Sequence, residues 1–351
     1  MSDFDFETRR ARLEPLFESA RSLADAATER GRRARERLVS SSGLSAQGVD
    51  FALQRCLETA PEEREIAALI RSTPRAQVAH VLLSANVFVA AHRAIAIALS
   101  ASPEVRVRAS RREPEMAELL LAGAPGSFRL VGELSPRSGD RLWAYGSDET
   151  MAEVATTLPP GVALHAHGSG FGAAILERMP SDSELGALLG KLAEDIVLFD
   201  QRGCLSPRVV LLNAQPDAAR ELARELAREL VAIEQRVPRG ALTVHELSEL
   251  TRFRDTAHFV GELFEAGPGF VSLSDRGGWL LPPAGRNIHV LTAPDALTAL
   301  DPYRPLLTSC AFFGETAGRE ALVRALPGAR VCGFGEMQRP PFDGPVDRRE
   351  S

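Results

Sequence analysis

The segment QVAHVLLSANVFVAAHRAIAIALSASPEVRVRAS, residues 77–110, predicts the fold of this chain. It begins with an apolar run at residues 77–85 that is typical of a buried strand, and Asn86 follows where the chain turns. Apolar residues then continue at helical spacing through residues 92–100, before a second strand pattern at residues 105–110. The segment therefore reads as strand, turn, helix and strand.

The alternation of strands and helices continues beyond this segment. Strand patterns occur at residues 127–130, 142–145 and 162–165, and helical patterns lie between them at residues 113–122 and from residue 148 onward. Strands that alternate with helices usually pair in parallel, and the helices then cover both faces of the sheet. We therefore expect an α/β fold built on a Rossmann-type parallel sheet.

The flanking regions contain more helical sequence. Residues 6–71 are rich in Ala, Arg, Glu and Leu at helical spacing and predict a helical lead-in. Residues 217–235 predict a long amphipathic helix, because their repeat is too short for a coiled coil. The other expected elements are helices at residues 181–195, 245–266 and 316–325 and strands at residues 209–213, 270–274, 279–282, 288–292 and 329–332.

The composition is that of an ordinary globular protein. Of 351 residues, 44% are hydrophobic and 25% are charged, which excludes a disordered or fibrous chain. The 41 basic and 47 acidic residues give a net charge of -6, which offers no basic footprint for nucleic acid or an anionic membrane. No apolar run reaches membrane-spanning length, and the acidic start differs from a signal peptide, so we expect a cytoplasmic protein.

Lysine and cysteine usage limits the chemistry further. Lys191 is the only lysine, and it lies in a helical pattern with exposed charges, so Schiff-base or Walker-type lysine chemistry is not indicated. The cysteines are far apart and form no CxxC pair; they are Cys56, Cys204, Cys310 and Cys332. This pattern indicates neither a disulfide framework nor a zinc site, and we expect no metal.

Cys204 is the first candidate for catalysis. It lies in FDQRGCLSPR, residues 199–208, between an apolar run and a turn that contains proline. A thiol on a glycine-flanked loop is placed where a backbone bend can present it to a ligand. The alternative is a small core residue, which is the commoner role of a lone cysteine.

Two glycine turns are candidates for cofactor binding. GSDET, residues 146–150, opens a helix whose N-terminal N–H groups suit a pyrophosphate, although Ser147 or Asp148 can equally be a plain helix cap. HGSGFG, residues 167–172, is a second such turn, but it lacks the full GxGxxG motif.

Polar residues after the first two strands leave similar alternatives. Asn86 can cap the following helix or donate to a developing oxyanion. Four arginines after the second strand pattern can form a solvated edge or hold a cofactor phosphate; they are Arg106, Arg108, Arg111 and Arg112.

In their order, VLLSANVFVAAHRAI, VRVRASRREP, WAYGSDET, HAHGSGFG and FDQRGCLSPR resemble the aldehyde dehydrogenase superfamily, most closely its LuxC-type acyl-CoA reductase branch. The superfamily has an Asn after the first strand, a basic residue after the second, a Gly-Ser at a helix start, a glycine turn and a nucleophilic Cys. These places are occupied by Asn86, Arg108, Gly146, Ser147 and Cys204. The resemblance covers residues 77–213, and the DQxGCxSP setting is its most specific part.

The resemblance implies an acyl-CoA reductase that forms an aldehyde through a thioacyl intermediate on Cys204. It assigns Asn86 and the backbone N–H of Cys204 to the oxyanion, and His165 or His167 to proton donation. Many oxidising members carry a glutamate base in the glycine turn, whereas HAHGSGFG has no acid. The missing acid favours a reductase, since reduction needs no water step.

The resemblance also implies a nicotinamide cofactor, NADPH or NADH. Gly146, Ser147 and Gly168 would lie at its pyrophosphate, while Arg108 and Ser110 would contact the adenosine ribose or a 2′-phosphate. Arginine at residue 108 permits NADPH. It is weak evidence for NADPH, because the chain has a single lysine and uses arginine at its other basic positions.

Domains and partners follow from the same resemblance. We expect a helical lead-in and nucleotide-binding domain over residues 1–172, a catalytic domain over residues 173–336 and a loose tail over residues 337–351. The substrate would be an acyl-CoA or acyl-carrier thioester, and the protein a homo-oligomer with acyl-transferring partner proteins. The superfamily's Glu-x-Phe-Gly-Pro segment has its nearest match in CAFFGE, residues 310–315, with the acid displaced. An acyltransferase-like or non-catalytic partner subunit is therefore the alternative.

Overall fold

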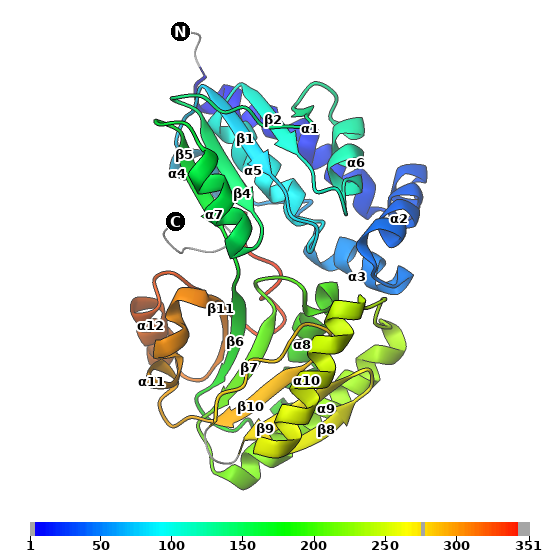
Figure 1. The fold of residues 1–351 in the computed structure, drawn as a ribbon, viewed down its shortest axis with the longest axis vertical. Helices are drawn as coiled ribbons and strands as arrows, with labels where there is room; N and C mark the ends of the chain where they lie inside the picture. The colour runs from blue at the N-terminus through cyan, green and yellow to red at the C-terminus, as the bar shows by residue number, and fades with distance from the viewer. Residues whose placement is uncertain (1–3, 275–277, 343–351) are drawn as a thin grey trace.

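Two β-sheets, one above the other in Figure 1, organise the protein. The computed structural model describes residues 4–274 and 278–342. The chain begins with four helices and then forms the first sheet. Residues 168–170 connect the last strand of the first sheet to the second sheet. The expected α/β class, with the fold of aldehyde dehydrogenases, is therefore confirmed.

The first sheet is parallel throughout and has the strand order β3-β2-β1-β4-β5. Its strands are β1 (Val78–Leu82), β2 (Glu104–Arg108), β3 (Arg129–Leu130), β4 (Arg141–Tyr145) and β5 (Ala163–His167). Val81 in the central strand pairs with Val107 on one side and Trp143 on the other. The sequence pattern predicted each of these strands within a few residues.

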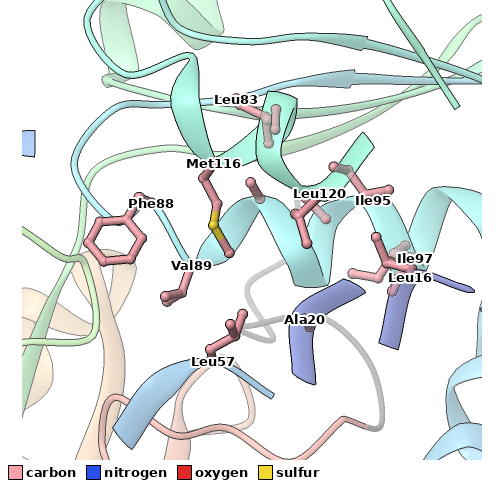
Figure 2. Packing of buried hydrophobic residues seen from close by; sticks show 14 of the residues in the cluster. Leu16, Ala20, Leu57, Leu83, Phe88, Val89, Ile95, Ile97, Met116 and Leu120 are labelled. Atoms are coloured by element: carbon pink, nitrogen blue, oxygen red, sulfur yellow. The ribbon is translucent and has the colours of Figure 1, made fainter. Parts of the chain in front are cut away.

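Helices cover both faces of the first sheet. α5 (Ala90–Ala101) is almost wholly buried, because it lies between the sheet and the N-terminal helices. Figure 2 shows its Ile95 and Ile97 among side chains of α1 (Phe6–Ala24) and α6 (Glu115–Gly123). α7 (Asp148–Thr157) covers the opposite face through Met151. The lead-in completes this half with α2 (Glu29–Ser42), α3 (Ala46–Cys56) and α4 (Glu63–Ser72).

The second sheet has the order β12-β11-β6-β7-β10-β9-β8 and is parallel except for β8. Its strands are β6 (Phe171–Leu176), β7 (Pro207–Leu212), β8 (Glu262–Ala266), β9 (Gly269–Ser274), β10 (Ile288–Thr292), β11 (Leu307–Phe313) and β12 (Arg330–Cys332). α8 (Asp182–Val197) and α9 (Pro216–Arg236) cover one face. α11 (Ala296–Leu300) and α12 (Thr316–Ala325) cover the other.

α10 (Val244–Val260) is less firmly attached than these helices. It lies over β8 and β9, and only Ala257 among its residues is buried. Phe259 near its end is 92% exposed. The helix is therefore held mainly by the side chains that face the sheet, such as Phe253, which stacks on Phe270.

Several expected elements differ from the structure. The helix predicted for residues 245–266 ends at Val260, and the antiparallel strand β8 follows it. Residues 279–282 form no strand, and the sequence pattern did not reveal β6 and β11. Both strands lie inside the second sheet and have long buried runs, so they lack the alternation that marks a half-exposed strand.

The end of the described chain returns to the first half. Met337 is buried, and its N–H donates to Asp195 Oδ1 at 3.1 Å. Phe342 packs edge-on against Phe17, with ring centroids 5.2 Å apart. The expectation of a loose tail from residue 337 is thus wrong for residues 337–342, because Met337 is buried in the core of the second half and Phe342 in the core of the first half. Residues 343–351 of that expected tail lie outside the described residues.

The expected domain boundary at residue 172 stays a prediction. The first sheet ends at His167, and the second begins at Phe171. In the described part of the chain, no helix combines the length and the apolar character that a membrane crossing requires.

Candidate active site

The candidate residues of the first sheet lie together at its carboxyl edge. Because β1, β2, β4 and β5 run parallel, the residues at their ends meet at one side of the sheet. A cavity of about 950 Å³ opens there, at the edge where open parallel sheets bind ligands. Eight of the candidate residues line it: Asn86, Arg108, Ser110, Gly146, Ser147, His167, Gly168 and Cys204. His165, the alternative to His167, does not line it.

Cys204 occupies a fixed turn between the two halves. The N–H of Ser206 donates to Gly203 O at 3.1 Å and closes the turn. The Thr308 hydroxyl donates to Cys204 O at 2.6 Å, and the Ser309 hydroxyl donates to Leu205 O at 3.0 Å. These bonds hold the backbone of the turn on β11, while the thiol remains partly exposed.

The other cysteines are poor nucleophiles. Cys56, Cys310 and Cys332 are buried, whereas Cys204 is only half-buried. Burial raises the pKa of all three thiols, that of Cys332 to about 12. A thiolate at neutral pH is therefore disfavoured at these positions.

The turn that carries Asn86 packs against the Cys204 turn. A Cβ at Gly203 would lie 3.0 Å from Val87 Cγ2, so glycine allows the close approach of the two turns. Phe88 meets Phe199 edge-on, with ring centroids 5.6 Å apart. Residues more than one hundred positions apart in the sequence thus form one wall of the cavity.

Arg112 orients the Asn86 amide. Its guanidinium donates to Asn86 Oδ1 at 2.9 Å. The amide nitrogen of Asn86 is then left as the donor for a ligand in the cavity. Arg112 itself lines the cavity, together with Arg108 and Arg111.

The other end of the cavity offers donors for an anion. Ser147 is the N-cap of α7, and its hydroxyl accepts the N–H of Thr150 at 3.3 Å, as the plain-cap interpretation expects. The helix N-terminus still directs its dipole to the cavity edge. A Cβ at Gly168 would overlap Asp148 Oδ1, which accepts the Ser169 N–H at 2.7 Å. With nearby arginines and a cavity of this volume, the residues present fit a dinucleotide.

The two histidines of β5 have different surroundings. His167 lines the cavity and stacks on Tyr145, with ring centroids 4.6 Å apart and planes 9° apart. His165 stacks on Trp143, and its Nε2 lies 3.1 Å from a guanidinium nitrogen of Arg141. Burial lowers the pKa of His165. Of the two, His167 is therefore the one placed to reach a ligand.

A family model now identifies the chain. The model described as acyl-CoA reductase (LuxC) matches residues 130–347, which is more than half of the sequence. The chain belongs to the LuxC acyl-CoA reductase family. The matched region includes His167 and Cys204 but begins after Asn86 and Arg108. No curated protein sequence matches the chain.

Solved structures similar to this LuxC protein share its fold at low sequence identity. An oxidoreductase from Marinobacter aquaeolei has a TM-score of 0.72 and 14% identity, and the match covers 96% of this chain and 79% of that one. A NAD-dependent benzaldehyde dehydrogenase from Corynebacterium glutamicum has a TM-score of 0.65 and 16% identity over 94% and 83% of the two chains. The Delta-pyrroline-5-carboxylate dehydrogenase from Mycobacterium tuberculosis has a TM-score of 0.64 and 14% identity over 97% and 72%.

This LuxC family protein is thus an oxidoreductase with the aldehyde dehydrogenase fold. The family implies a nicotinamide cofactor. The individual roles of the eight cavity residues remain predictions. Within residues 4–274 and 278–342, no three His, Cys, Asp or Glu side chains converge as a metal site.

The structure adds residues that the sequence did not single out. Glu58, in the loop after α3, lines the same cavity and pairs with the buried Arg93. Burial raises the pKa of Glu58 to about 7, against the opposing effect of Arg93. Tyr145 precedes the Gly-Ser turn at the end of β4, and the parallel register with β5 places it opposite His167. Nothing in the sequence connected Glu58 to Cys204.

The segment at residues 310–315 does not reach the LuxC cavity. None of its residues lines the cavity. Glu315 lies beyond the carboxyl end of β11, where its N–H donates to Glu177 Oε2 at 2.8 Å, while Thr308 near the start of the strand contacts the Cys204 turn. CAFFGE, the nearest sequence match to the superfamily's Glu-x-Phe-Gly-Pro segment, therefore lies outside this cavity.

A second, smaller cavity adjoins the first in this LuxC protein. Its volume is about 530 Å³, and both cavities are lined by Ser169, Gly170 and Arg208. Its apolar walls come from Phe171, Phe253, Leu281, Pro282 and Leu306. Burial lowers the pKa of Arg208 to about 10, and its guanidinium donates to Pro282 O at 2.9 Å. Glu249, Arg252 and Thr256 line the second cavity as well, so a space of mixed apolar and polar character begins beside the cavity that contains Cys204.

Proposed function

We propose that this protein reduces a fatty acyl thioester to an aldehyde through a thioacyl intermediate on Cys204, with NADPH or NADH as reductant. The observation that carries the proposal is the single cavity that Cys204 and Asn86 share with the α7 N-terminus and the arginines. A nucleophile, an oxyanion donor and an anion site in one cavity are the parts that such a reaction needs.

In the first step, Cys204 Sγ attacks the thioester carbonyl as the thiolate, after its proton has passed to solvent. The Asn86 amide and the Cys204 N–H donate to the oxyanion, and losing one such donor typically raises the barrier by about 3 kcal/mol. As the tetrahedral species collapses, the acyl carbon keeps its bond to Cys204 Sγ and its bond to the CoA sulfur breaks. His167 is the group we assign to protonate the leaving thiolate.

The glycine turn supports a reductive rather than a hydrolytic outcome. Residues 167–170 contain no carboxylate that could activate water beside Cys204. The acids that line the cavity are Glu58, which is paired with Arg93, and Glu153 on α7. A thioacyl group without a water-activating base persists until it is reduced.

The cofactor would lie along the carboxyl edge of the first sheet. Gly146, Ser147 and Gly168 would hold the pyrophosphate, and Arg108 and Ser110 would contact the adenosine ribose. Arg111 at the same edge favours NADPH, because guanidinium groups bind a 2′-phosphate well. When bound, the cofactor supplies the hydride that releases the acyl group from Cys204 as an aldehyde.

The second cavity is the place we assign to the acyl chain. Its apolar walls begin at the glycine turn and Arg208, which also line the cavity of Cys204. A fatty acyl chain would bury its methylene groups there at a gain of about 0.8 kcal/mol each. We propose an acyl-CoA or acyl-carrier thioester as donor, in a cytoplasmic homo-oligomer that receives acyl groups from partner proteins.

Absorbance at the nicotinamide band tests the proposal with a panel of acyl-CoAs of different chain length. Wild type should oxidise NADPH and release aldehyde, and intact mass without cofactor should reveal an acyl adduct. Cys204→Ala should abolish both, whereas Cys332→Ala, which removes a buried thiol, should retain the adduct.

Other outcomes separate the alternatives. An adduct without cofactor binding or aldehyde would indicate an acyltransferase. The absence of both adduct and cofactor binding in wild type would indicate a non-catalytic partner subunit. An adduct that survived Cys204→Ala unchanged would end the proposed role of Cys204.

A further inference from the structure

Three consecutive residues before the Cys204 turn have left-handed backbone conformations. The φ angles of Phe199, Asp200 and Gln201 are 54°, 49° and 65°. Each of the three is at most 2% exposed. A side chain with a Cβ disfavours this conformation, and left-handed residues other than glycine rarely follow one another. The surrounding structure must therefore hold this segment in place.

Asp200 is the main anchor of the left-handed segment. Its Oδ1 accepts two bonds from the Arg286 guanidinium, at 2.9 Å and 2.7 Å. Its Oδ2 accepts the N–H of Gly240 at 3.0 Å, and its backbone carbonyl accepts the N–H of Gly285 at 3.0 Å. One buried residue thus ties the segment to two separate loops.

Arg286 is itself fixed from several directions. It is 2% exposed and has a φ angle of 72°. Its remaining terminal nitrogen donates to Val237 O at 2.6 Å and to Glu234 Oε2 at 2.5 Å. The guanidinium therefore connects α9 to the left-handed segment. Its buried positive charge lies between the carboxylates of Asp200 and Glu234.

Gln201 spans the base of the nucleophile turn. Its amide nitrogen donates to Pro207 O at 2.7 Å and to Asn287 O at 2.6 Å, and its Oε1 accepts the N–H of Asn287 at 2.8 Å. Pro207 is the first residue of β7, directly after the Cys204 turn. The side chain of Gln201 thus joins the two ends of the loop that contains Cys204.

We infer that Asp200, Arg286 and Gln201 are positioning residues that fix the Cys204 turn in the orientation the reaction requires. The inference rests on the proposed function, because the proposed reaction is what requires Cys204 to be held in one orientation. The left-handed segment reverses the chain where η1 (Leu198–Gln201) follows α8, so the next residues turn into the cavity. The buried contacts offset the backbone strain, and they converge on the loop that carries the nucleophile.

The test uses the full-length protein and Asp200→Asn, which keeps the size of the side chain but removes its charge. Three quantities are measured: the alkylation rate of Cys204 by iodoacetamide across pH, the single-turnover rate of acylation, and hydrogen exchange of the amides at residues 199–204. We expect faster exchange in these amides and acylation slower by about 10- to 100-fold, since small misplacements of reacting groups have effects of that size. NADPH binding should remain unchanged.

Asp140→Asn is the matched control. Asp140 is also a buried aspartate that accepts backbone N–H groups, those of Val78 and Arg137, but it lies in the first half of the molecule and does not line the cavity. It should lower the melting temperature and leave Cys204 alkylation, acylation and the exchange at residues 199–204 at wild-type rates. If Asp200→Asn fails to fold, Arg286→Lys replaces it, because lysine keeps the charge and loses the paired bonds.

The inference is overturned if Asp200→Asn, or Arg286→Lys in its place, lowers stability as Asp140→Asn does but leaves Cys204 alkylation and local exchange unchanged. Failure of the proposed function gives a different result. Wild type would then form no acyl adduct, while alkylation and exchange would still measure how firmly the Cys204 turn is held.

Discussion

Asn86 illustrates how one hydrogen bond leaves the other end of an amide available to a ligand. An amide offers both an acceptor and two donor hydrogens, and Arg112 occupies the acceptor at 2.9 Å. The nitrogen is therefore the end available to an oxyanion formed at Cys204. Sequence reasoning left Asn86 open between a helix cap and an oxyanion donor. The structure gives α5 no side-chain cap, which removes the first alternative.

Asn86→Ala should lower the acylation rate of Cys204 by about 100- to 1,000-fold, because it removes one oxyanion donor. Binding of the nicotinamide cofactor and thermal stability should change little, since Asn86 is exposed. Single-turnover acylation, cofactor titration and a thermal scan measure the three quantities. Equal losses in acylation and cofactor affinity would contradict a role limited to the oxyanion.

Among the elements, β6 contacts the Cys204 turn through Gly172. The N–H of Gly172 donates to Ser206 O at 2.8 Å, and a Cβ at Gly172 would lie 2.6 Å from Leu205 O. Atoms of Met337 and Ser309 lie at similar distances from this position. A glycine is thus required where β6 passes directly under the turn, and the glycine-rich HGSGFG segment has a packing role besides its proposed cofactor role.

Gly172→Ala should displace the Leu205 carbonyl and with it the Cys204 turn. We expect a loss of about 1–3 kcal/mol in unfolding free energy, as for overpacked core positions, together with slower acylation. Gly186→Ala is the control, because a Cβ at this position of α8 would enter open space. It should be neutral or stabilising by up to about 1 kcal/mol. Denaturant unfolding and single-turnover acylation distinguish the two variants.

At the scale of the whole molecule, the two halves are joined by more than the chain crossing at residues 168–170. Arg93 in the first half donates to Pro340 O at 2.8 Å, and Phe342 packs on Phe17 and His92. Gln338 and Pro340 also line the main cavity. The returning segment therefore contributes both to the contact between the halves and to the wall of the site (Figure 1).

Phe342→Ala should cost about 3–5 kcal/mol of stability, because the ring is 1% exposed. It should also weaken cofactor binding, because Gln338 and Pro340 of the same segment line the main cavity. Phe259→Ala, which truncates a ring that is 92% exposed, should change stability by less than about 0.5 kcal/mol. Equal melting temperatures for the two variants would contradict the packing role of Phe342.

Stability should also depend on pH through His289 in the second sheet. Burial lowers the pKa of His289 to about 4, from an ordinary value near 6.5. Between these values the unfolded chain binds a proton that the folded protein does not, so stability falls as pH decreases from about 6.5 to 4, by up to about 3 kcal/mol. In His289→Gln, unfolding free energies measured across this range should fall less steeply. An unchanged slope would contradict the prediction.

Local sequence patterns were sufficient to predict the parallel first sheet and its helical cover, and together with the family resemblance they predicted the candidate residues of the cavity. These patterns are strand and helix periods, glycine turns, and polar residues that directly follow strands. Asn86, Arg108 and Ser147 follow strands of the first sheet, and parallel strands bring their carboxyl ends to one edge. Cys204 precedes β7 instead, and the family resemblance of its DQxGCxSP setting singled it out.

The distant residues that complete the site could be assigned only from the folded molecule. Glu58, Arg208 and Gln338 reach the cavity through packing between segments that are far apart in the chain, and such contacts leave no periodic signal. The same holds for Arg286 and Asp200, whose pairing depends on a left-handed turn that no local preference of Phe, Asp and Gln would predict. Buried strands such as β6 and β11 were missed because continuous burial removes the alternation that a sequence reveals.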